Sequence, residues 1–367
     1  MRYYIIAGEA SGDLHGSNLI KALHEKDAVA DIRCWGGDRM EAAGATLVKH
    51  YRDLAFMGFV EVLMHLRTIF SNIDFCKKDM LAYKPDVLIL IDYPGFNMRI
   101  AEWAKQQGIP VVYYISPQVW AWKENRVKKI KRDVDLMLVI LPFEVDFYTK
   151  WDFKVSYVGH PLIQVVQDEQ DNVPVQKISD KPIIALLPGS RKQEIKVKLP
   201  VMLTVVKHFP QYQFVVAQAP AQPDEFYKEI IGNENVMLAK AQTYNILKQA
   251  KAALVTSGTA TLETALFGVP QVVCYKGNPI SYMLAKKLIK VKYISLVNLI
   301  MDKPVVTELI QADLNEENLK KELHRLLDGG SFLQQQLQDY KILWHKLGDS
   351  NASQEAAEGI VSFMRKK

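Results

Sequence analysis

The sequence predicts an α/β protein made of two Rossmann-like domains that face a cleft. Two observations support this fold class. An apolar run at residues 3–7 breaks at once into a small-residue loop at 8–13, and about half the chain later the run at 183–187 breaks into a similar loop at 188–191. A buried strand that ends in such a loop before a helical pattern is typical of the start of an α/β domain. The loops also leave backbone N–H groups at a helix N-terminus, where anionic groups bind.

The first half of the chain alternates between strand and helix patterns. After the strand at 3–7, a helix is expected near Asp13, because a carboxylate suits a helix N-terminus. A short strand is expected at 31–35. Apolar runs of the kind found in buried parallel sheets then follow at 87–91, 111–115 and 136–141. Right-handed crossovers would bring the carboxyl ends of these strands to one edge of the sheet.

The second half repeats this scheme after a polar segment. Residues 164–182 are rich in Gln and Asp and contain two prolines, so we expect them to be the linker. The expected strands lie at 183–187, 213–217, 252–256 and 271–275, and helical patterns cover 315–328, 331–347 and 352–365. The predicted domains are therefore 1–165 and 166–345. A helical tail at 346–367 is expected to pack back on the first domain or on a partner chain.

Composition places the chain among globular proteins that work in a reducing compartment. The hydrophobic fraction is 49% and the charged fraction is 24%, as in ordinary soluble domains. The three cysteines form no CxxC or Cys/His cluster, so neither a disulfide nor structural zinc is expected. Met1 leads directly into the first strand, which argues against a secretory signal. The net charge is +5, with a basic run at 123–132 that is either a solvated helix face or a surface for an anionic partner.

Asp92 is the leading catalytic candidate. It follows the strand at 87–91, and ligands of open α/β sheets bind outside the carboxyl ends of the strands. A carboxylate at this place either caps the next loop or acts as a general base. Pro94 and Gly95 shape the turn and weaken the interpretation of Asp92 as a simple helix start.

Two tryptophans follow the strand at 111–115. Trp120 and Trp122 belong to the segment at 116–122, which reads Ser-Pro-Gln-Val-Trp-Ala-Trp. They either pack in the core or form the wall of a sugar or acyl-chain site.

Two loops of the second half are suited to a diphosphate. Arg191 can donate a forked pair of hydrogen bonds to diphosphate oxygens or pair with Glu194. The segment at 257–263, Ser-Gly-Thr-Ala-Thr-Leu-Glu, offers hydroxyls, backbone N–H groups and a helix dipole at one place. Glu263 either favours that dipole or accepts both ribose hydroxyls.

Other chemistries have little support in the sequence. The first loop is GxxxGD and not GxGxxG, and the strand at 31–35 ends in two glycines where a dinucleotide site needs an acid. Metal-binding His spacing, GxSxG and a Walker lysine do not occur. Asp133 and Asp135 have the DxD form, but they enter a strand directly after the basic run, which favours a structural role. We therefore expect no metal and no cofactor.

An apolar band at 56–70 is wider than one buried helix face requires. It either packs in the core or, together with nearby cationic side chains, touches a membrane surface or an acyl chain. Its large members are Phe59, Val62, Leu63, Leu66, Ile69 and Phe70.

Five motifs in fixed order give the chain a resemblance to a known family. They are Gly8-Glu9-Ala10-Ser11-Gly12-Asp13, Asp92-Tyr93-Pro94-Gly95-Phe96-Asn97, Ser116-Pro117-Gln118-Val119-Trp120-Ala121-Trp122, Leu187-Pro188-Gly189-Ser190-Arg191 and Ser257-Gly258-Thr259-Ala260-Thr261-Leu262-Glu263. Together they resemble the lipid-A-disaccharide synthase family from Met1 to about residue 345.

The resemblance implies a GT-B glycosyltransferase of lipopolysaccharide biosynthesis. Such an enzyme joins UDP-2,3-diacylglucosamine to 2,3-diacylglucosamine 1-phosphate (lipid X) with inversion and releases UDP. The resemblance also implies that the enzyme is cytoplasmic and peripheral, at the inner face of the inner membrane. It would contact an anionic membrane surface and bind no nucleic acid. A homodimer with exchanged C-terminal elements is implied as well.

The resemblance further implies roles for individual residues. Asp92 matches the essential aspartate of the family. The expected acceptor-side residues are Glu9, Ser11, Gly12, Asp13, Trp120 and Trp122. The expected UDP-binding residues are Gly189, Ser190, Arg191, Ser257, Gly258, Thr259, Thr261, Glu263 and Asn298.

Three other functions are weighed against this one. A peptidoglycan N-acetylglucosaminyl transferase shares UDP and a lipid acceptor, but the segment at 116–122 argues against it. A UDP-sugar 2-epimerase would place acids where this chain has Ser257, Gly258 and Thr259. A non-catalytic nucleotide-binding protein would not need Asp92 at the end of a strand.

Overall fold

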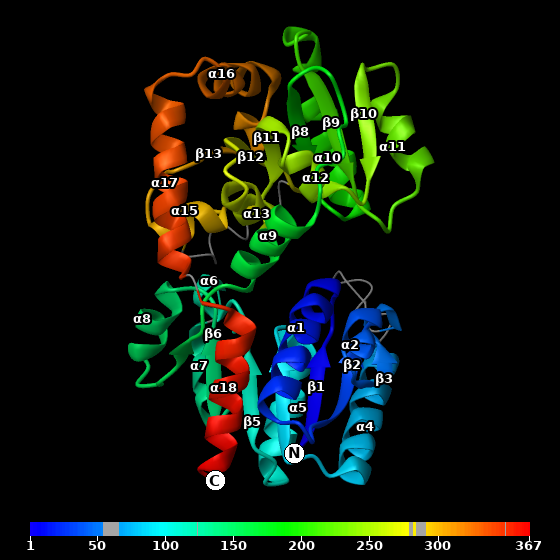
Figure 1. Cartoon of the computed structure of the whole chain (residues 1–367), viewed down its shortest axis with the longest axis vertical. Helices are drawn as coiled ribbons and strands as arrows, with labels where there is room; N and C mark the ends of the chain where they lie inside the picture. The colour runs from blue at the N-terminus through cyan, green and yellow to red at the C-terminus, as the bar shows by residue number, and fades with distance from the viewer. Residues whose placement is uncertain (54–65, 123, 279–281, 284–290, 349) are drawn as a thin grey trace. The chain divides into compact units, whose positions relative to one another are not determined.

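The computed structural model divides the chain into two compact units. It describes residues 1–53, 66–122, 124–278, 282–283, 291–348 and 350–367. The first unit is Met1–Pro161 together with Asp349–Lys367, and the second is Leu162–Gly348. Each unit has a parallel sheet with helices on both faces, so the predicted α/β class is confirmed (Figure 1).

The sheet of the first unit has seven strands in its described part, in the order β3-β2-β1-β4-β5-β6-β7, all paired in parallel. Successive strands are added in one direction from β1 to β3 and in the opposite direction from β4 to β7. This reversal between β1 and β4 is the Rossmann arrangement. The edge strands β3 and β7 were not predicted, because they are short and only partly buried. The strands are β1 (Arg2–Ala7), β2 (Asp31–Gly36), β3 (Thr46–His50), β4 (Val87–Ile91), β5 (Val111–Tyr114), β6 (Leu136–Val139) and β7 (Ser156–Tyr157).

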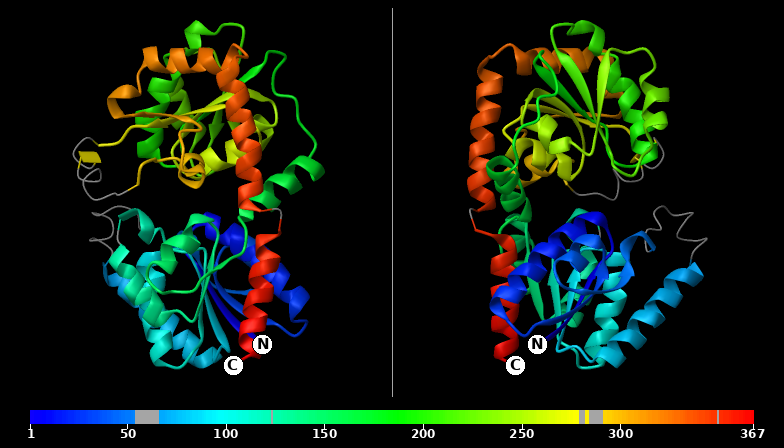
Figure 2. Two further views of the ribbon diagram at one scale, coloured as in Figure 1. Left: turned by 90° about the vertical axis from the view of Figure 1, so that its left-hand side faces the viewer. Right: turned by 45° about the vertical axis from the view of Figure 1, so that its right-hand side comes forward.

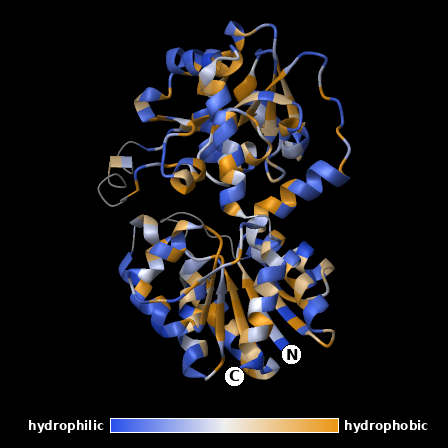
Figure 3. Cartoon of the chain, turned by 60° about the vertical axis from the view of Figure 1, so that its left-hand side comes forward, coloured by the Kyte–Doolittle hydropathy of each residue, from blue (hydrophilic) through white to orange (hydrophobic). Residues whose placement is uncertain are grey.

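Alternate side chains of these strands enter two separate cores, as the pleat of a strand requires. Tyr4 and Ile6 face a core shared with α4, α5 and α7, whereas Tyr3 and Ile5 face a core shared with α1 and α18. The central strands therefore consist mostly of hydrophobic residues, as their colouring shows (Figure 3). The helices of the unit are α1 (Ala10–Lys26), α2 (Asp38–Ala42), α4 (Leu66–Tyr83), α5 (Pro94–Gln106), α6 (Val119–Trp122), α7 (Val127–Asp133), α8 (Phe143–Thr149) and α18 (Ala352–Arg365).

The predicted helical tail is confirmed as α18, which packs on α1 of the first unit (Figure 2). The side chain of Asn351 caps its N-terminus by accepting hydrogen bonds from the N–H groups of Ser353 and Gln354, at 3.1 and 3.3 Å. Lys26 also pairs with Glu358 at 3.0 Å. The C-terminal helix α18 therefore forms part of the core of the first, N-terminal unit.

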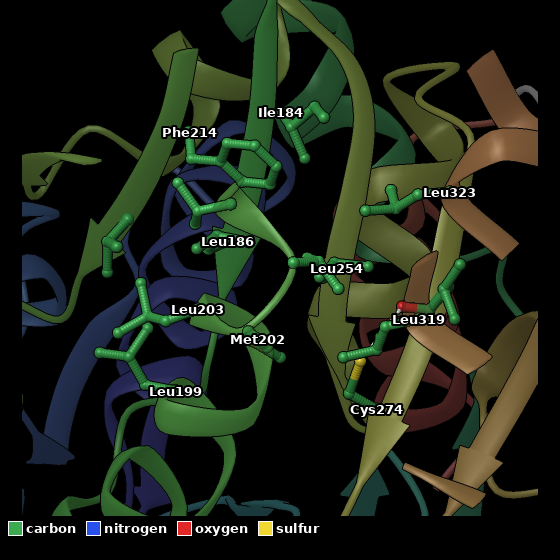
Figure 4. Packing of buried hydrophobic residues seen from close by; sticks show 14 of the residues in the cluster. Ile184, Leu186, Leu199, Met202, Leu203, Phe214, Leu254, Cys274, Leu319 and Leu323 are labelled. Carbon is green, nitrogen blue, oxygen red and sulfur yellow. Dashed lines mark hydrogen bonds between the residues drawn. The ribbon is translucent and has the colours of Figure 1, made fainter. Parts of the chain in front are cut away.

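The described part of the second unit repeats the plan with the strand order β10-β9-β8-β11-β12-β13. Its larger core lies between the sheet and α10, α11 and α16 (Figure 4). The strands are β8 (Ile183–Leu187), β9 (Gln213–Gln218), β10 (Val236–Lys240), β11 (Ala250–Thr256), β12 (Gln271–Tyr275) and β13 (Thr307–Ile310). The helices are α9 (Pro161–Asn172), α10 (Lys192–Leu203), α11 (Asp224–Ile231), α12 (Thr243–Leu247), α13 (Thr259–Leu266), α15 (Leu296–Met301), α16 (Glu316–Leu327) and α17 (Ser331–Leu347).

The expectation that residues 164–182 form the linker is wrong for their first half. Residues up to Asn172 belong to α9, whose apolar side chains Leu162, Ile163 and Val166 are buried at helical spacing. The Gln- and Asp-rich composition reflects the exposed face of this helix. In the described part of the chain, no helix combines the length and apolar character needed to cross a membrane.

Candidate functional site

The first candidate site lies where the strand order of the first unit reverses. β1 pairs with β4, and the register sets Ala7 beside Ile91, so the loops that follow these strands are neighbours. Ligands of open α/β sheets bind at such a switch point. Gly8 is required there, because a Cβ atom on it would lie 2.3 Å from Cγ of Tyr93. The predicted loop at 8–13 and Asp92 are thus brought to one place.

The backbone at Asp92 is held in an unusual conformation. Asp92 and Tyr93 have φ values of 43° and 49°, and Ile115 on the neighbouring loop has 65°. A β-branched residue with positive φ is a genuine outlier. The carbonyl of Asp92 accepts hydrogen bonds from the Tyr113 hydroxyl at 2.6 Å and from Asn97 Nδ2 at 2.7 Å. Strain of this kind clusters at functional sites, where the surrounding structure fixes it.

The carboxyl group of Asp92 has the electrostatics of a general base that works near neutral pH. Burial raises its pKa to about 6, the nearby negative charge of Glu9 adds to the rise, and the N–H of Tyr93 partly offsets it. A base is most effective when its pKa lies close to the working pH. The negative charge of Glu9 thus contributes to the raised pKa of Asp92.

The remaining residues of the predicted loop at 8–13 lie in the first turns of α1, which begins at Ala10, and they differ in their exposure. Ser11 is exposed, whereas Gly12 is buried, and a Cβ atom on it would lie 3.0 Å from Cβ of Ala7. Asp13 is buried, and its carboxylate accepts hydrogen bonds from the N–H groups of Gly37 at 2.8 Å and Met40 at 3.0 Å. It thereby caps α2 and fastens it to α1, which is a structural task.

Replacing Asp13 with alanine should lower the free energy of unfolding by about 2–3 kcal/mol, the scale of lost hydrogen bonds to a buried charged group. Chemical denaturation followed by circular dichroism measures this. Asp38→Ala on the same helix is the matched control, because the side chain of Asp38 is 70% exposed and should cost less than about 1 kcal/mol. Equal losses of unfolding free energy in the two variants would show that the Asp13 carboxylate does not hold the start of α2.

The two tryptophans of the segment at 116–122 have different environments. Trp120 is 8% exposed and packs edge-on against Phe143, with ring centroids 4.9 Å apart. Trp122 is 50% exposed, and the guanidinium of Arg126 lies 5.7 Å from the centre of its ring. Trp120 is therefore core packing, and Trp122 is the one that a ligand can reach.

A buried glutamate that the sequence did not point to supports this segment. Glu144 is 1% exposed, and its carboxylate accepts a hydrogen bond from the N–H of Leu141 at 3.0 Å. Burial raises its pKa to about 7, although hydrogen bonds from Leu141 and Ser116 work against the rise. The Ser116 hydroxyl is also 2.6 Å from the Tyr148 hydroxyl. This network fixes the start of the segment that leads into α6, the helix that carries Trp122.

Two cations of the basic run, Lys129 and Arg132, form ion pairs within their own domain. Lys129 and Arg132 both pair with Glu102, at 2.5 and 2.7 Å, and Arg132 also pairs with Asp133 at 2.7 Å. Asp135 accepts a hydrogen bond from the N–H of Val111 at 3.0 Å. Asp133 and Asp135, the residues of the DxD pattern, therefore have structural contacts. The ion pairs also leave fewer cations for an anionic partner than the sequence suggested.

The second candidate site lies at the carboxyl ends of β8 and β11, which are paired strands of the second unit. Gly189 has a φ of 112°, a conformation that suits glycine. Ser190 is exposed, and the side chain of Arg191 is 60% exposed at the start of α10. The contact between Arg191 and Glu194 is long, at 3.8 Å. The guanidinium thus remains available for a ligand.

The loop after β11 presents the N-terminus of α13. Gly258 has a φ of 148° and precedes the helix, and Thr259 is exposed. The Thr261 hydroxyl donates to the Gly258 carbonyl at 2.8 Å, and the Ser257 hydroxyl donates to the Ile294 carbonyl at 2.8 Å. The loop is therefore held from both sides at the start of α13, and a helix N-terminus is a place where anions bind.

Glu263 and Asn298 differ in what they can offer a ligand. Glu263 is partly buried and accepts a hydrogen bond from the Tyr244 hydroxyl at 3.3 Å, and burial raises its pKa. Asn298 is 1% exposed, and its amide bonds the backbone of Val306 through both N and O, each at 2.9 Å. It also donates to Glu308 at 2.9 Å. Asn298 therefore holds α15 to the segment that follows it, at Val306 and Glu308.

Of the apolar band at 56–70, the structure describes the backbone from residue 66 and the side chains from residue 67. Phe59, Val62 and Leu63 lie outside the described residues, as does the side chain of Leu66. Ile69 packs against the core of the first unit, whereas Phe70 is 54% exposed with the Arg99 guanidinium 6.0 Å from its ring centre.

Comparison with known proteins gives a consistent result. The family model described as lipid-A-disaccharide synthetase matches residues 3–360. The lipid-A-disaccharide synthase of Syntrophus aciditrophicus (strain SB) is 40% identical, with 99% of this chain and 97% of that protein covered. The one from Geobacter metallireducens is 38% identical, with 100% and 98% covered.

Solved structures show the same architecture. The glycotransferase of kitacinnamycin has a TM-score of 0.68 at 14% identity and covers 98% of both chains. A UDP-GlcNAc 2-epimerase from Neisseria meningitidis has a TM-score of 0.66 at 13% identity and covers 100% of both chains. These likenesses establish the GT-B type of fold and nothing about the reaction.

Proposed function

The chain belongs to the lipid-A-disaccharide synthase family, and from this we propose that Asp92 is the general base of its glycosyl transfer. The enzyme is a glycosyltransferase. Its reaction joins UDP-2,3-diacylglucosamine to lipid X and gives the β-1,6-linked lipid A disaccharide 1-phosphate and UDP. The single observation that carries the role of Asp92 is its place at the switch point, with a pKa raised to about 6 beside Glu9.

The proposed chemical step is one displacement. The Asp92 carboxylate takes the proton from the 6-hydroxyl of lipid X as that oxygen attacks C1 of the donor sugar. The bond between C1 and the β-phosphate oxygen breaks, and its electron pair leaves with UDP. Attack from the opposite face inverts C1 and gives the β linkage. The acceptor is proposed to lie beside Glu9, Ser11 and Trp122.

The donor is proposed to bind the second unit. Arg191 and the N–H groups at the start of α13 would hold the diphosphate and stabilise the negative charge on the leaving UDP. Glu263 would accept the ribose hydroxyls. Asn298 would act indirectly. It donates a hydrogen bond to Glu308, which in turn accepts one from the N–H of Ile294. The carbonyl of Ile294 then accepts a hydrogen bond from the Ser257 hydroxyl.

Release of UDP tests this function. UDP-2,3-diacylglucosamine is incubated with the full chain, with and without lipid X. We expect rapid UDP release only when lipid X is present, because the 6-hydroxyl is the nucleophile. Release at the same rate without lipid X would indicate hydrolysis or another acceptor and would reject the proposal.

The pH dependence of kcat/KM should report Asp92. Only the deprotonated carboxylate can take a proton, so kcat/KM should rise with pH and level off above an apparent pKa of about 6. Glu9→Gln removes a neighbouring negative charge that disfavours ionisation, so it should move this pKa downward. A profile without an ionisation in this region, or one that Glu9→Gln moves upward, would contradict the assignment.

Membrane contact is proposed from the exposed end of the apolar band. Phe70 and Arg99 place a large apolar ring beside a cation, a pairing that suits an anionic lipid surface. Phe70→Ser should lower binding to vesicles that contain phosphatidylglycerol by several-fold. Val29→Ser is the control, since Val29 is 81% exposed in the turn between α1 and β2, away from α4 in the sequence. If the two variants bind vesicles equally well, Phe70 is not part of a membrane surface. Such contact would place the enzyme at the cytoplasmic face of the inner membrane.

A homodimer with exchanged C-terminal elements belongs to the same proposal. The α1–α18 contact could form equally between two chains, because α18 follows the second unit at Gly348. Light scattering of the purified protein tests this, and the mass of a single chain would reject it.

A further inference from the structure

A buried lysine lies beneath the proposed donor site. Lys198 on α10 is 4% exposed, and its ammonium group donates a hydrogen bond to the hydroxyl of Thr256. Thr256 is the last residue of β11 and directly precedes the loop that begins at Ser257. The ammonium also lies 5.9 Å from the ring centre of Tyr275, the last residue of β12. Lys198 therefore sits at the carboxyl ends of two adjacent strands.

The surroundings of Lys198 do not neutralise its charge by a direct ion pair. No carboxylate of the described residues lies within 4.0 Å of the ammonium. Cys274 is its buried neighbour, and burial raises the pKa of that thiol to about 12, so it carries no charge. Burial also lowers the pKa of Lys198, while the negative charge of Glu194 opposes that effect.

Glu194 is shared between two cations. It lies one turn before Lys198 on α10 and also faces Arg191 at 3.8 Å. Its carboxylate packs on Gly189, where a Cβ atom would meet Oε2 at 2.5 Å. Arg191, Glu194 and Lys198 thus bring two positive charges and one negative charge together next to the loop at 188–191, whereas the ammonium groups of Lys192 and Lys196 lie against the ring of Phe226. The excess is one positive charge.

We propose that Lys198 is a positioning residue of the donor site, whose buried positive charge selects a nucleoside diphosphate over the nucleoside alone. This inference rests on the proposed binding of UDP to the second unit. Lys198 acts through Thr256, whose hydroxyl it holds, and through the field that its charge sets up across the protein interior. It need not touch the ligand itself.

The physical reason is the cost of an unpaired buried charge. Taking an ammonium group out of water without a partner is unfavourable, and an apolar side chain of the same length would fill the space without that cost. A diphosphate bound at the two neighbouring loops would supply the missing negative charge. Because the interior screens charges weakly, the attraction extends over several ångströms.

Binding of UDP and of uridine to the full chain separates this role from a structural one. Lys198→Gln removes the charge and keeps an N–H donor for Thr256. We expect it to weaken UDP binding roughly tenfold and to change uridine binding less than about twofold. Lys198→Arg, which keeps the charge, should retain the preference for UDP. Lys196→Gln is the control on the same helix, since Lys196 is exposed.

The outcomes are distinguishable by calorimetry. Equal weakening of UDP and uridine in Lys198→Gln would mean that the lysine only supports the fold, and unchanged UDP binding would mean that its charge is not used; either result overturns the inference. If Lys198→Gln does not fold, Lys198→Met carries the same expectations, because an apolar chain suits the buried site. A wild-type protein that binds UDP no better than uridine would reject the donor-site proposal itself, and this inference with it.

Discussion

Replacing Asp92 with asparagine should lower turnover by about 10²–10⁴-fold, the usual contribution of a general base. Asparagine has nearly the same shape but cannot take the proton from the acceptor hydroxyl. The variant should fold normally, because the hydrogen bonds that fix the Asp92 turn are made by its backbone carbonyl with Tyr113 and Asn97. Initial rates of UDP release at saturating donor and lipid X measure the effect.

Two controls separate loss of the base from loss of the site. UDP should bind the Asp92→Asn variant as it binds the wild type, since UDP is assigned to the other unit. The thermal unfolding midpoint should also stay the same within a few degrees. A folded Asp92→Asn variant with near-normal turnover would remove Asp92 from the chemical step.

Replacing Arg191 with alanine should weaken UDP binding by about 1.5–3 kcal/mol, the scale of hydrogen bonds to a charged group. The loss should appear in binding and not in stability, because the side chain is 60% exposed and its contact with Glu194 is 3.8 Å long. Calorimetry with UDP measures it.

Lys192→Ala is the matched control for Arg191. It removes a positive charge from the next residue, whose ammonium lies against the ring of Phe226 at 5.7 Å and not at the loop. Its effect on UDP affinity should be small. If Arg191→Ala and Lys192→Ala change the affinity equally, Arg191 acts only through net charge, and unchanged affinity in Arg191→Ala would exclude it from the site.

The parts of the fold that the sequence predicted well are those with strong apolar runs. β4 and β8 are buried along their whole length, and β1 is buried at every residue after Arg2, so their limits and the loops after them could be found from hydrophobicity alone. The position of Asp92 followed directly from the limit of β4. The linker prediction failed because α9 buries only one face, and its many polar residues resemble a loop in composition.

The roles of buried polar residues could not be predicted from local sequence. Asp13 caps α2 through Gly37 and Met40, which lie 24 and 27 residues away. Glu144 and Lys198 each sit among charged or aromatic residues that are typical of a helix surface, and only tertiary packing buries them.

The expected role of Asn298 in binding UDP rested only on its place in a segment shared with the family. The family resemblance assigned it to UDP, whereas its amide is occupied by Val306 and Glu308. The spacing Ser295–Asn298 does signal a helix cap, since the Ser295 hydroxyl accepts the N–H of Asn298 at 3.3 Å. That local signal was present in the sequence and indicates a supporting role.

The stereochemistry of the product tests the central claim most directly. The wild-type chain is incubated with UDP-α-2,3-diacylglucosamine and lipid X, and the isolated disaccharide is examined by NMR at the new anomeric carbon. A single displacement assisted by Asp92 predicts a β linkage to the 6-oxygen of lipid X, with the configuration at C2 of the transferred sugar unchanged. An α linkage, or a sugar inverted at C2 with no disaccharide, would contradict it.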